Sequence, residues 1–245
     1  MFLEILKYFL TIVISYLIGS VSFARIISTN HFKKDITKIG SKNPGTINMT
    51  RSHGVMGGLS TFILDILKGA VPSLIAYFIG GTVLLYVAGF SAVIGHIFPA
   101  LYRFKGGKGL ATTIGVFLVA NPGCTLIALF IGLIIILATD IGSFASLTII
   151  TITSIIECIT LDNRHNIPVI CLIIAMYALV LFMHRKNIVR LLTGRENKVN
   201  LKEHLKIKKK TRNIQDVKVE NEQNFESKIE SEQNLENENI DNKEN

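Results

Sequence analysis

Residues Leu110 to Thr139 read LATTIGVFLVANPGCTLIALFIGLIIILAT and contain no Asp, Glu, Lys or Arg. A helix needs about 20 predominantly apolar residues to cross the hydrocarbon core of a bilayer. Further uncharged runs cover 8–24, 69–95, 141–156 and 167–183, and the mean hydropathy of the whole chain is +0.44. A soluble core can bury one such helix but hardly five runs. The sequence therefore predicts an all-α, polytopic integral membrane protein.

The charges between these runs predict the topology. Basic residues crowd the segments 25–51, 103–108 and 184–190, whereas 80–81, 121–123 and 157–166 carry few. The positive-inside rule assigns the basic segments to the cytoplasm. The path that satisfies this rule has about seven transmembrane helices, an external N-terminus and a cytoplasmic C-terminus. The predicted spans are 3–27, 55–79, 82–102, 109–120, 123–139, 143–159 and 166–183.

The fourth span is short, because its residues reach only about 16 Å at 1.5 Å per residue. We therefore expect a half-helix or a re-entrant segment that packs against protein.

The spans belong to a transmembrane domain, 1–205. Residues 206–245 are rich in Asn, Glu and Gln, and we predict a disordered, charged tail. The whole chain has a net charge of +8, and the excess of basic residues lies in the membrane part and not in the tail. The expected partners are membrane lipids, and nucleic acid is not expected.

Two loops carry residues suited to binding phosphate. The first reads IGSKNPGTINMTR over 39–51, and the second contains GHIFP at 95–99 and FKGGKG at 104–109. Glycines let the backbone approach phosphate oxygens, and a helix that begins near Gly109 offers unpaired N–H groups. The second loop lacks the spacing of a Walker A motif. Topogenic charge alone would require lysines, but not the Ser, Asn, Pro and Gly that accompany them here.

Two charged residues and a histidine lie in the interior of the predicted spans 55–79 and 82–102. Asp65 and Lys68 are three residues apart on one helix face, which favours a mutual ion pair over a functional role. His96 is interpreted as a packed histidine. The three cysteines show no metal-ligand spacing, and we predict neither a metal nor a cofactor.

Taken in order, these clusters resemble the bacterial PlsY family, the acyl-phosphate:glycerol-3-phosphate acyltransferases. The matching segments are 34–36, 40–45, 48–51, 64–69, 95–99, 104–112, 184–188 and 190–194. The resemblance implies a seven-helix enzyme of phospholipid biosynthesis in the bacterial plasma (inner) membrane. Its substrates would be acyl phosphate and glycerol 3-phosphate. The acyl group would pass to the 1-hydroxyl, giving lysophosphatidic acid and phosphate.

The resemblance also implies the site residues. Those expected to be catalytic are Ser41, Arg51, Lys108, His184 and Asn187. Those expected to bind substrate are Asn43, Gly45, Asn48, Lys105, Gly106, Gly107 and Gly109. Because acyl phosphate is already activated, positioning and charge neutralisation can accelerate transfer without a covalent intermediate. The role of Ser41 and the oligomeric state, a monomer included, stay open.

Two departures from the family pattern bear on function. Asp140 stands where the family usually carries Arg, and a carboxylate there should weaken phosphate binding unless it pairs with a neighbour. Ile47 stands where the family usually has a threonine hydroxyl. The alternatives are a transporter or lipid-handling membrane protein for anionic solutes, and a catalytically weak member of the family.

Overall fold

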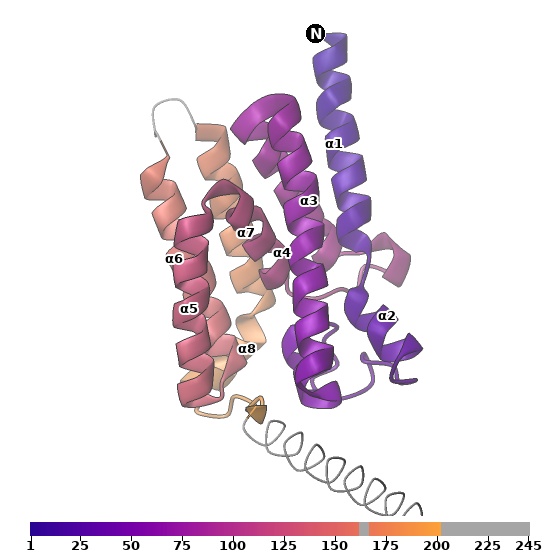
Figure 1. Cartoon of the computed structure of the whole chain (residues 1–245), viewed down its shortest axis with the longest axis vertical. Helices are drawn as coiled ribbons and strands as arrows, with labels where there is room; N and C mark the ends of the chain where they lie inside the picture. Colours follow the sequence, from indigo (N-terminus) through magenta and orange to yellow (C-terminus); the bar gives the residue numbers. More distant parts are fainter. Residues whose placement is uncertain (162–166, 202–245) are drawn as a thin grey trace, which may run out of the picture. The chain divides into compact units, whose positions relative to one another are not determined.

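Two glycines turn the chain back on itself in the middle of its longest helical segment, α3 (Thr46–Ile97). Gly80 and Gly81 have non-helical backbone angles, and Gly81 has a φ of 72°, which glycine adopts without steric cost. As a result Gly89 lies beside Ser73, so close that a Cβ on Gly89 would be 3.0 Å from Ser73 Oγ. Figure 1 shows the two arms of α3 next to each other. These arms correspond to the predicted spans 55–79 and 82–102, although the second arm ends at Ile97 and not at 102.

The computed structural model describes residues 1–161 and 167–201, which cluster into one unit. Besides α3, its elements are α1 (Phe2–Ser20), α2 (Phe23–Asn30), η1 (Ala100–Tyr102), α4 (Leu110–Ala120), α5 (Pro122–Thr139), α6 (Gly142–Thr160), α7 (Ile167–Met183) and α8 (Arg185–Leu192). The all-α membrane fold is confirmed. The predicted boundary at 205 and the tail 206–245 lie outside the described residues.

Within the described residues, four helical segments are long and apolar enough to cross a membrane, or five with the bent pair α7 and α8. One of the four, Thr46–Tyr102, contains both arms of α3, and α4 is a shorter apolar helix. The N-terminus and the segment that follows α8 lie at opposite ends of the unit (Figure 1), as an odd number of crossings requires. Seven crossings and their direction stay predictions.

The predicted span 3–27 corresponds to the apolar segment Phe2–Asn30, which is long enough to cross a membrane but is interrupted after α1. α1 ends at Ser20, Val21 and Ser22 are extended, and α2 then leaves at an angle (Figure 1). The break frees the carbonyl of Val21, which accepts a hydrogen bond of 2.8 Å from Lys68 Nζ. This partner lies far along the chain, in α3.

The short helix α4 packs inside the protein, as expected. Its residues from Thr112 to Phe117 are buried. Gly115 lies against the backbone of Ile66, and Gly69 of α3 lies against the backbone of Thr112, so a Cβ on either glycine would overlap a carbonyl group. Small residues permit this close approach of helices in membranes.

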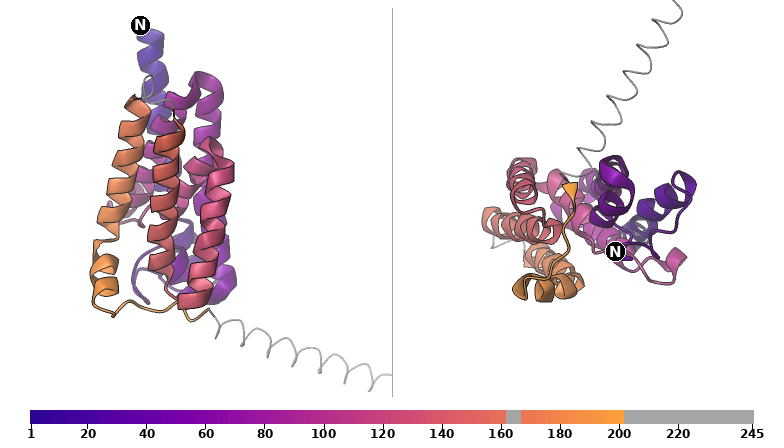
Figure 2. Two further views of the ribbon diagram at one scale, coloured as in Figure 1. Left: turned by 90° about the vertical axis from the view of Figure 1, so that its left-hand side faces the viewer. Right: turned by 90° about the horizontal axis from the view of Figure 1, so that it is seen from below.

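The end of the unit away from the basic loops is filled by a hydrophobic core. It joins the second arm of α3 to α4, α6 and α7, and its largest buried members include Tyr86, Phe117, Ile150 and Ile173. The hydroxyl of Tyr86 donates to Glu157 Oε1, so the buried carboxylate of α6 has a partner in α3. Figure 2 shows the axes of α6 and α7 lying nearly parallel, with the chain running in opposite directions along them.

Candidate functional site

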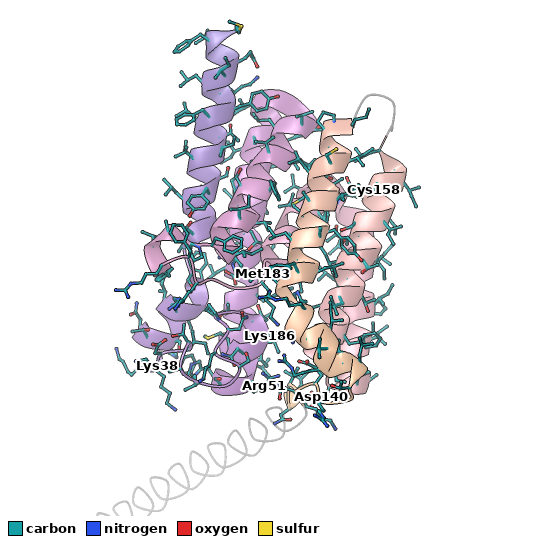
Figure 3. The ribbon with its side chains drawn as sticks, turned by 180° about the vertical axis from the view of Figure 1, so that it is seen from behind. Lys38, Arg51, Asp140, Cys158, Met183 and Lys186 are labelled. Atoms are coloured by element: carbon teal, nitrogen blue, oxygen red, sulfur yellow. The ribbon has the colours of Figure 1, made fainter. Side chains whose placement is uncertain are left out.

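An open cavity of about 1020 Å³ lies where the three basic segments meet. Arg51, Asp140 and Lys186 mark this end of the unit, and Cys158 marks the other (Figure 3). All predicted site residues except Gly107 line the cavity: Ser41, Asn43, Gly45, Asn48, Arg51, Lys105, Gly106, Lys108, Gly109, His184 and Asn187. The structure thus brings together residues from three separate parts of the chain.

Asn48 holds the first loop in shape. Its Nδ2 donates to the carbonyls of Ile36 (3.2 Å) and Ile39 (3.1 Å), and its Oδ1 accepts from Ser41 N at 2.8 Å. Gly40, with a φ of 57°, leaves the space that the Asn48 amide occupies. Three hydrogen bonds to the loop indicate that Asn48 positions Ser41.

The second loop is anchored by backbone hydrogen bonds to the end of α3. Gly106 N donates to Ile97 O and Gly107 N donates to His96 O, both at 3.1 Å. Gly107 lies so close to the His96 ring that a Cβ would overlap it. Gly107 therefore supports the loop from behind, which explains why it does not line the cavity.

Arg25 fixes the same loop from the side of α2. Its Nη2 donates to Lys105 O at 2.8 Å, and its guanidinium lies over the ring of Tyr102. Arg25 also lines the cavity, whereas the predictions gave it no role there.

The N-termini of α3, α4 and α6 lie at the cavity, as does the start of α8 at His184 and Arg185. Gly45 and Thr46 start α3, Gly109 and Leu110 start α4, and Gly142 starts α6; all five residues line the cavity. The first N–H groups of a helix have no partner within it, and the helix dipole places partial positive charge there. Several such ends in one cavity favour an anionic ligand.

Two hydroxyl groups add to this preference. The side-chain oxygens of Thr46 and Ser143 are buried without a hydrogen-bond partner, and both residues line the cavity. A buried polar atom without a partner costs free energy, which a ligand oxygen can recover. Both hydroxyls can donate to phosphate.

A chain of polar contacts connects the second and third basic segments. Lys108 Nζ donates to Asn187 Oδ1, and Asn187 Nδ2 donates to Glu196 Oε1 at 2.9 Å. Glu196 Oε2 accepts from Arg190 Nε at 2.9 Å. The carboxylate of Glu196 forms its ion pair with Arg190. Lys108 is therefore oriented by the neutral side-chain amide of Asn187 and not by a negatively charged group.

The environment of Lys108 changes its acidity. Burial lowers the pKa of Lys108 to about 8; the negative charge of Glu196 opposes this shift, while Arg190 and Arg51 add to it. A lysine in such surroundings gains from a bound anion, because the anion replaces the lost solvation of the ammonium group.

His184 is held in one tautomer. Its Nδ1 lies 2.8 Å from the carbonyl oxygen of Val180, which can only accept, so the proton resides on Nδ1. The Nε2 of the neutral ring is then a free acceptor. His184 lines the cavity, where such an acceptor suits a hydroxyl group.

Arg51 is oriented by backbone carbonyls. Its Nε donates to Lys198 O at 2.9 Å and its Nη2 to Asn197 O at 3.3 Å. These carbonyls carry no net charge, so they orient the guanidinium without neutralising it. Its remaining N–H groups are available to a ligand.

The predicted ion pair in α3 is confirmed. Lys68 Nζ lies 2.8 Å from Asp65 Oδ1, and both side chains are buried. His96 Nδ1 lies 3.8 Å from the same carboxylate. Asp65 and His96 also line the cavity, so the pair contributes to its wall and not only to packing.

The other half of the cavity is apolar. Its wall is formed by Leu59 and Phe62 of α3, Leu133 and Ile136 of α5, and Ile149 of α6. Leu59 and Leu133 are about half exposed, at 47% and 50%, so the cavity opens on an outer, apolar face of the helices. A molecule with an anionic head and a long apolar chain matches both halves.

Sequence reasoning missed the roles of Glu196 and Arg190. Arg190 was placed only in a basic segment, and Glu196 was given no role. The signal was present in the sequence, because Glu196 is a lone acidic residue that follows a basic, amphipathic segment. An isolated carboxylate among cations commonly pairs with one of them.

Comparisons with known proteins agree with this geometry. The family model described as "Glycerol-3-phosphate acyltransferase" matches residues 9–194. Glycerol-3-phosphate acyltransferase from Finegoldia magna is 39% identical over 187 residues, covering 76% of this chain and 93% of that protein. Its counterpart from Thermoanaerobacter pseudethanolicus is 38% identical over 197 residues, covering 80% of this chain and 98% of that protein.

Two solved structures are also similar. The crystal structure of PlsY (YgiH), an integral membrane glycerol 3-phosphate acyltransferase, matches in its glycerol 3-phosphate form with a TM-score of 0.72 and 35% identity. That match covers 78% of this chain and 94% of the other. The lysophosphatidic acid form of the same protein matches with a TM-score of 0.71 and 34% identity, over 81% and 98% of the two chains.

Proposed function

The chain belongs to the glycerol-3-phosphate acyltransferase family, and we propose that it transfers a fatty acyl group from acyl phosphate to the 1-hydroxyl of glycerol 3-phosphate. It is an integral membrane acyltransferase of phospholipid biosynthesis. The observation that carries the choice of donor is the amphipathic cavity, where three helix N-termini, Arg51 and Lys108 face an apolar wall. In acyl phosphate, the phosphate is attached directly to the reacting carbonyl carbon, and the apolar acyl chain extends from the other side of that carbon.

Two phosphate groups are to be held at once, one from each substrate. Lys108, Arg51 and Arg190 lie close enough to influence one another electrostatically, and Arg25 of α2 contacts the second loop at Lys105; all five line the cavity. Arginine binds phosphate oxygens in pairs, and lysine acts as a point charge. This excess of cations supports a site that accepts two anions.

In the reaction, the 1-hydroxyl oxygen attacks the carbonyl carbon of the acyl phosphate. A C–O bond forms, and charge develops on the carbonyl oxygen. The bond from carbon to the phosphate oxygen then breaks, and inorganic phosphate leaves with the electron pair. Cations and helix N–H groups that stabilise this charge lower the barrier without a covalent enzyme intermediate.

The hydroxyl must lose its proton during the attack. His184 is suited to accept it, because its Nδ1 donates to Val180 O and leaves Nε2 as an acceptor. Ser41, fixed through its backbone by Asn48, is assigned to a phosphate oxygen. Positioning by these groups turns an encounter of two substrates into a reaction within one complex.

The proposed membrane is the bacterial plasma (inner) membrane. The cavity would lie at its cytoplasmic face, with the N-terminus outside and the C-terminus inside. The gathering of the three basic segments at one end of the helices supports this orientation. Both phosphorylated substrates are then reached from the cytoplasm and the acyl chain from the bilayer.

The test measures phosphate release by the purified protein in detergent, given palmitoyl phosphate with and without glycerol 3-phosphate. Arg51→Ala and Lys108→Ala are measured in parallel, with thermal unfolding as the control for folding. We expect release that depends on glycerol 3-phosphate and is lost in both variants. Folded wild-type protein that releases no phosphate would exclude acyl phosphate as the donor.

A further inference from the structure

The segment that follows α8, residues 196–201, passes across the cavity, and we name it the strap. Four of its residues line the cavity: Glu196, Asn197, Val199 and Leu201. In the view from below, Figure 2 shows it extending from α8 over the other helices. Glu196 anchors its first end by pairing with Arg190.

Asp140 anchors the other end. Its carboxylate accepts from Asn200 N at 3.0 Å and from Leu201 N at 3.1 Å, and its carbonyl accepts from Val199 N at 2.9 Å. Asp140 has a φ of 59°, a left-handed conformation that Asp tolerates better than most residues. One residue at the junction of α5 and α6 thus binds three consecutive backbone N–H groups of the strap.

Between the two anchors, the strap accepts the hydrogen bonds of Arg51. The carbonyl groups of Asn197 and Lys198 receive its Nη2 and Nε. Asp140 itself does not line the cavity, and its negative charge is directed to backbone amides rather than to a ligand. Arg51 and Asp140 lie near each other at this end of the unit (Figure 3).

We propose that Asp140 is a positioning residue for the reaction. It fixes the strap, and the strap carbonyls hold the guanidinium of Arg51 in the orientation that binds phosphate. The carboxylate therefore supports phosphate binding, where its charge alone would oppose it. The kinetic part of this inference rests on the proposed function; the anchoring of the strap does not.

The decisive variants are Asp140→Gly, which removes both acceptors without strain at a positive φ, and Asp140→Asn, which keeps one acceptor oxygen. We expect Asp140→Gly to lower kcat/KM for glycerol 3-phosphate or acyl phosphate by at least about tenfold, because a shift of about 1 Å in a catalytic group can cost about 10²-fold. Asp140→Asn should fall between it and the wild type. Glu4→Gln, which removes a carboxylate at the far end of α1, is the matched control and should leave kcat/KM unchanged.

A double-mutant cycle separates positioning from general destabilisation. In the Arg51→Lys background, where the paired donors to the strap are absent, Asp140→Gly should change kcat/KM by less than about twofold. Equal losses in both backgrounds would overturn the proposal, and so would wild-type kinetics in Asp140→Gly.

Hydrogen–deuterium exchange gives a readout that does not require turnover. Amides of 197–201 should exchange faster in Asp140→Gly than in the wild type, while α5 and α6 stay protected. Unchanged exchange in the strap would refute its anchoring by Asp140. If the wild-type protein shows no turnover, the proposed function fails, and exchange together with the affinity for inorganic phosphate still decides this inference.

Discussion

Replacing Lys108 by Met removes one positive charge from the cavity and keeps an unbranched side chain of similar length. The ammonium group is oriented by Asn187 and is largely withdrawn from solvent. A unit charge about 4 Å from a developing negative charge contributes about 4 kcal/mol at an effective dielectric constant of about 20. If this interaction is made only in the transition state, Lys108→Met lowers kcat by about 10³-fold.

The assay is phosphate release from palmitoyl phosphate in the presence of glycerol 3-phosphate. Lys7→Met is the matched control, because Lys7 lies in α1 and pairs with the exposed Glu4, away from the cavity. We expect the control to keep wild-type rates and both variants to unfold at wild-type temperatures. A folded Lys108→Met protein within tenfold of the wild-type kcat would refute the assignment of Lys108 to transition-state charge.

The pKa of Lys108 gives this prediction a second, independent readout. With a pKa of about 8, Lys108 is charged below pH 8 and becomes neutral as the pH rises through that value. kcat/KM should therefore fall above about pH 8, and the decline in kcat should lie at higher pH because bound phosphate favours the charged form. Lys108→Arg, which stays charged, should remove the decline even if its rate is lower.

Three further substitutions test how the site is built. Asn48→Ala removes three hydrogen bonds from the first loop, each worth about 1 kcal/mol, so we expect a lower Tm and a lower kcat/KM together. Ser41→Ala keeps the backbone bond to Asn48, so we expect an unchanged Tm with kcat reduced by about 10²-fold, and unchanged kcat would exclude a role for the hydroxyl. Gly115→Ala places a methyl group against the backbone of Ile66 and should lower the Tm, whereas Gly123→Ala meets open space and should not.

The sequence was sufficient to locate most helices because the bilayer restricts their length and composition. The spans predicted at 123–139, 143–159 and 166–183 correspond to α5 (Pro122–Thr139), α6 (Gly142–Thr160) and α7 (Ile167–Met183), each within one residue at either end. The sequence did not predict the break after Ser20. The Val21 carbonyl that the break leaves without a helical partner accepts a hydrogen bond from Lys68, which is distant in sequence. Local composition cannot report such a partner.

The site was predictable as a group of residues but not as a set of roles. If the positive-inside rule holds, the loops that are rich in glycine and lysine lie on the same side of the membrane. Their side chains were therefore expected to come together there. That Asn48 positions a loop, or that Glu196 pairs with Arg190, depends on hydrogen bonds between separate segments. Asp140 is a second example. From the sequence, its negative charge was expected to weaken phosphate binding, whereas in the structure its carboxylate oxygens accept hydrogen bonds from backbone N–H groups.

The shape of the cavity bears on the transporter alternative. A transporter commonly binds its solute near the middle of the membrane, between broken helices, and opens alternately to the two sides. Here the cavity is lined by residues of the basic end and by the apolar faces of α3, α5 and α6. The opposite end of the described helices is occupied by the core around Tyr86, Phe117 and Ile173, and the carboxylate of Glu157 there is bonded to Tyr86. A ligand that enters among the basic loops therefore meets packed side chains instead of a path onward, which suits a substrate that reacts and leaves on the side where it entered.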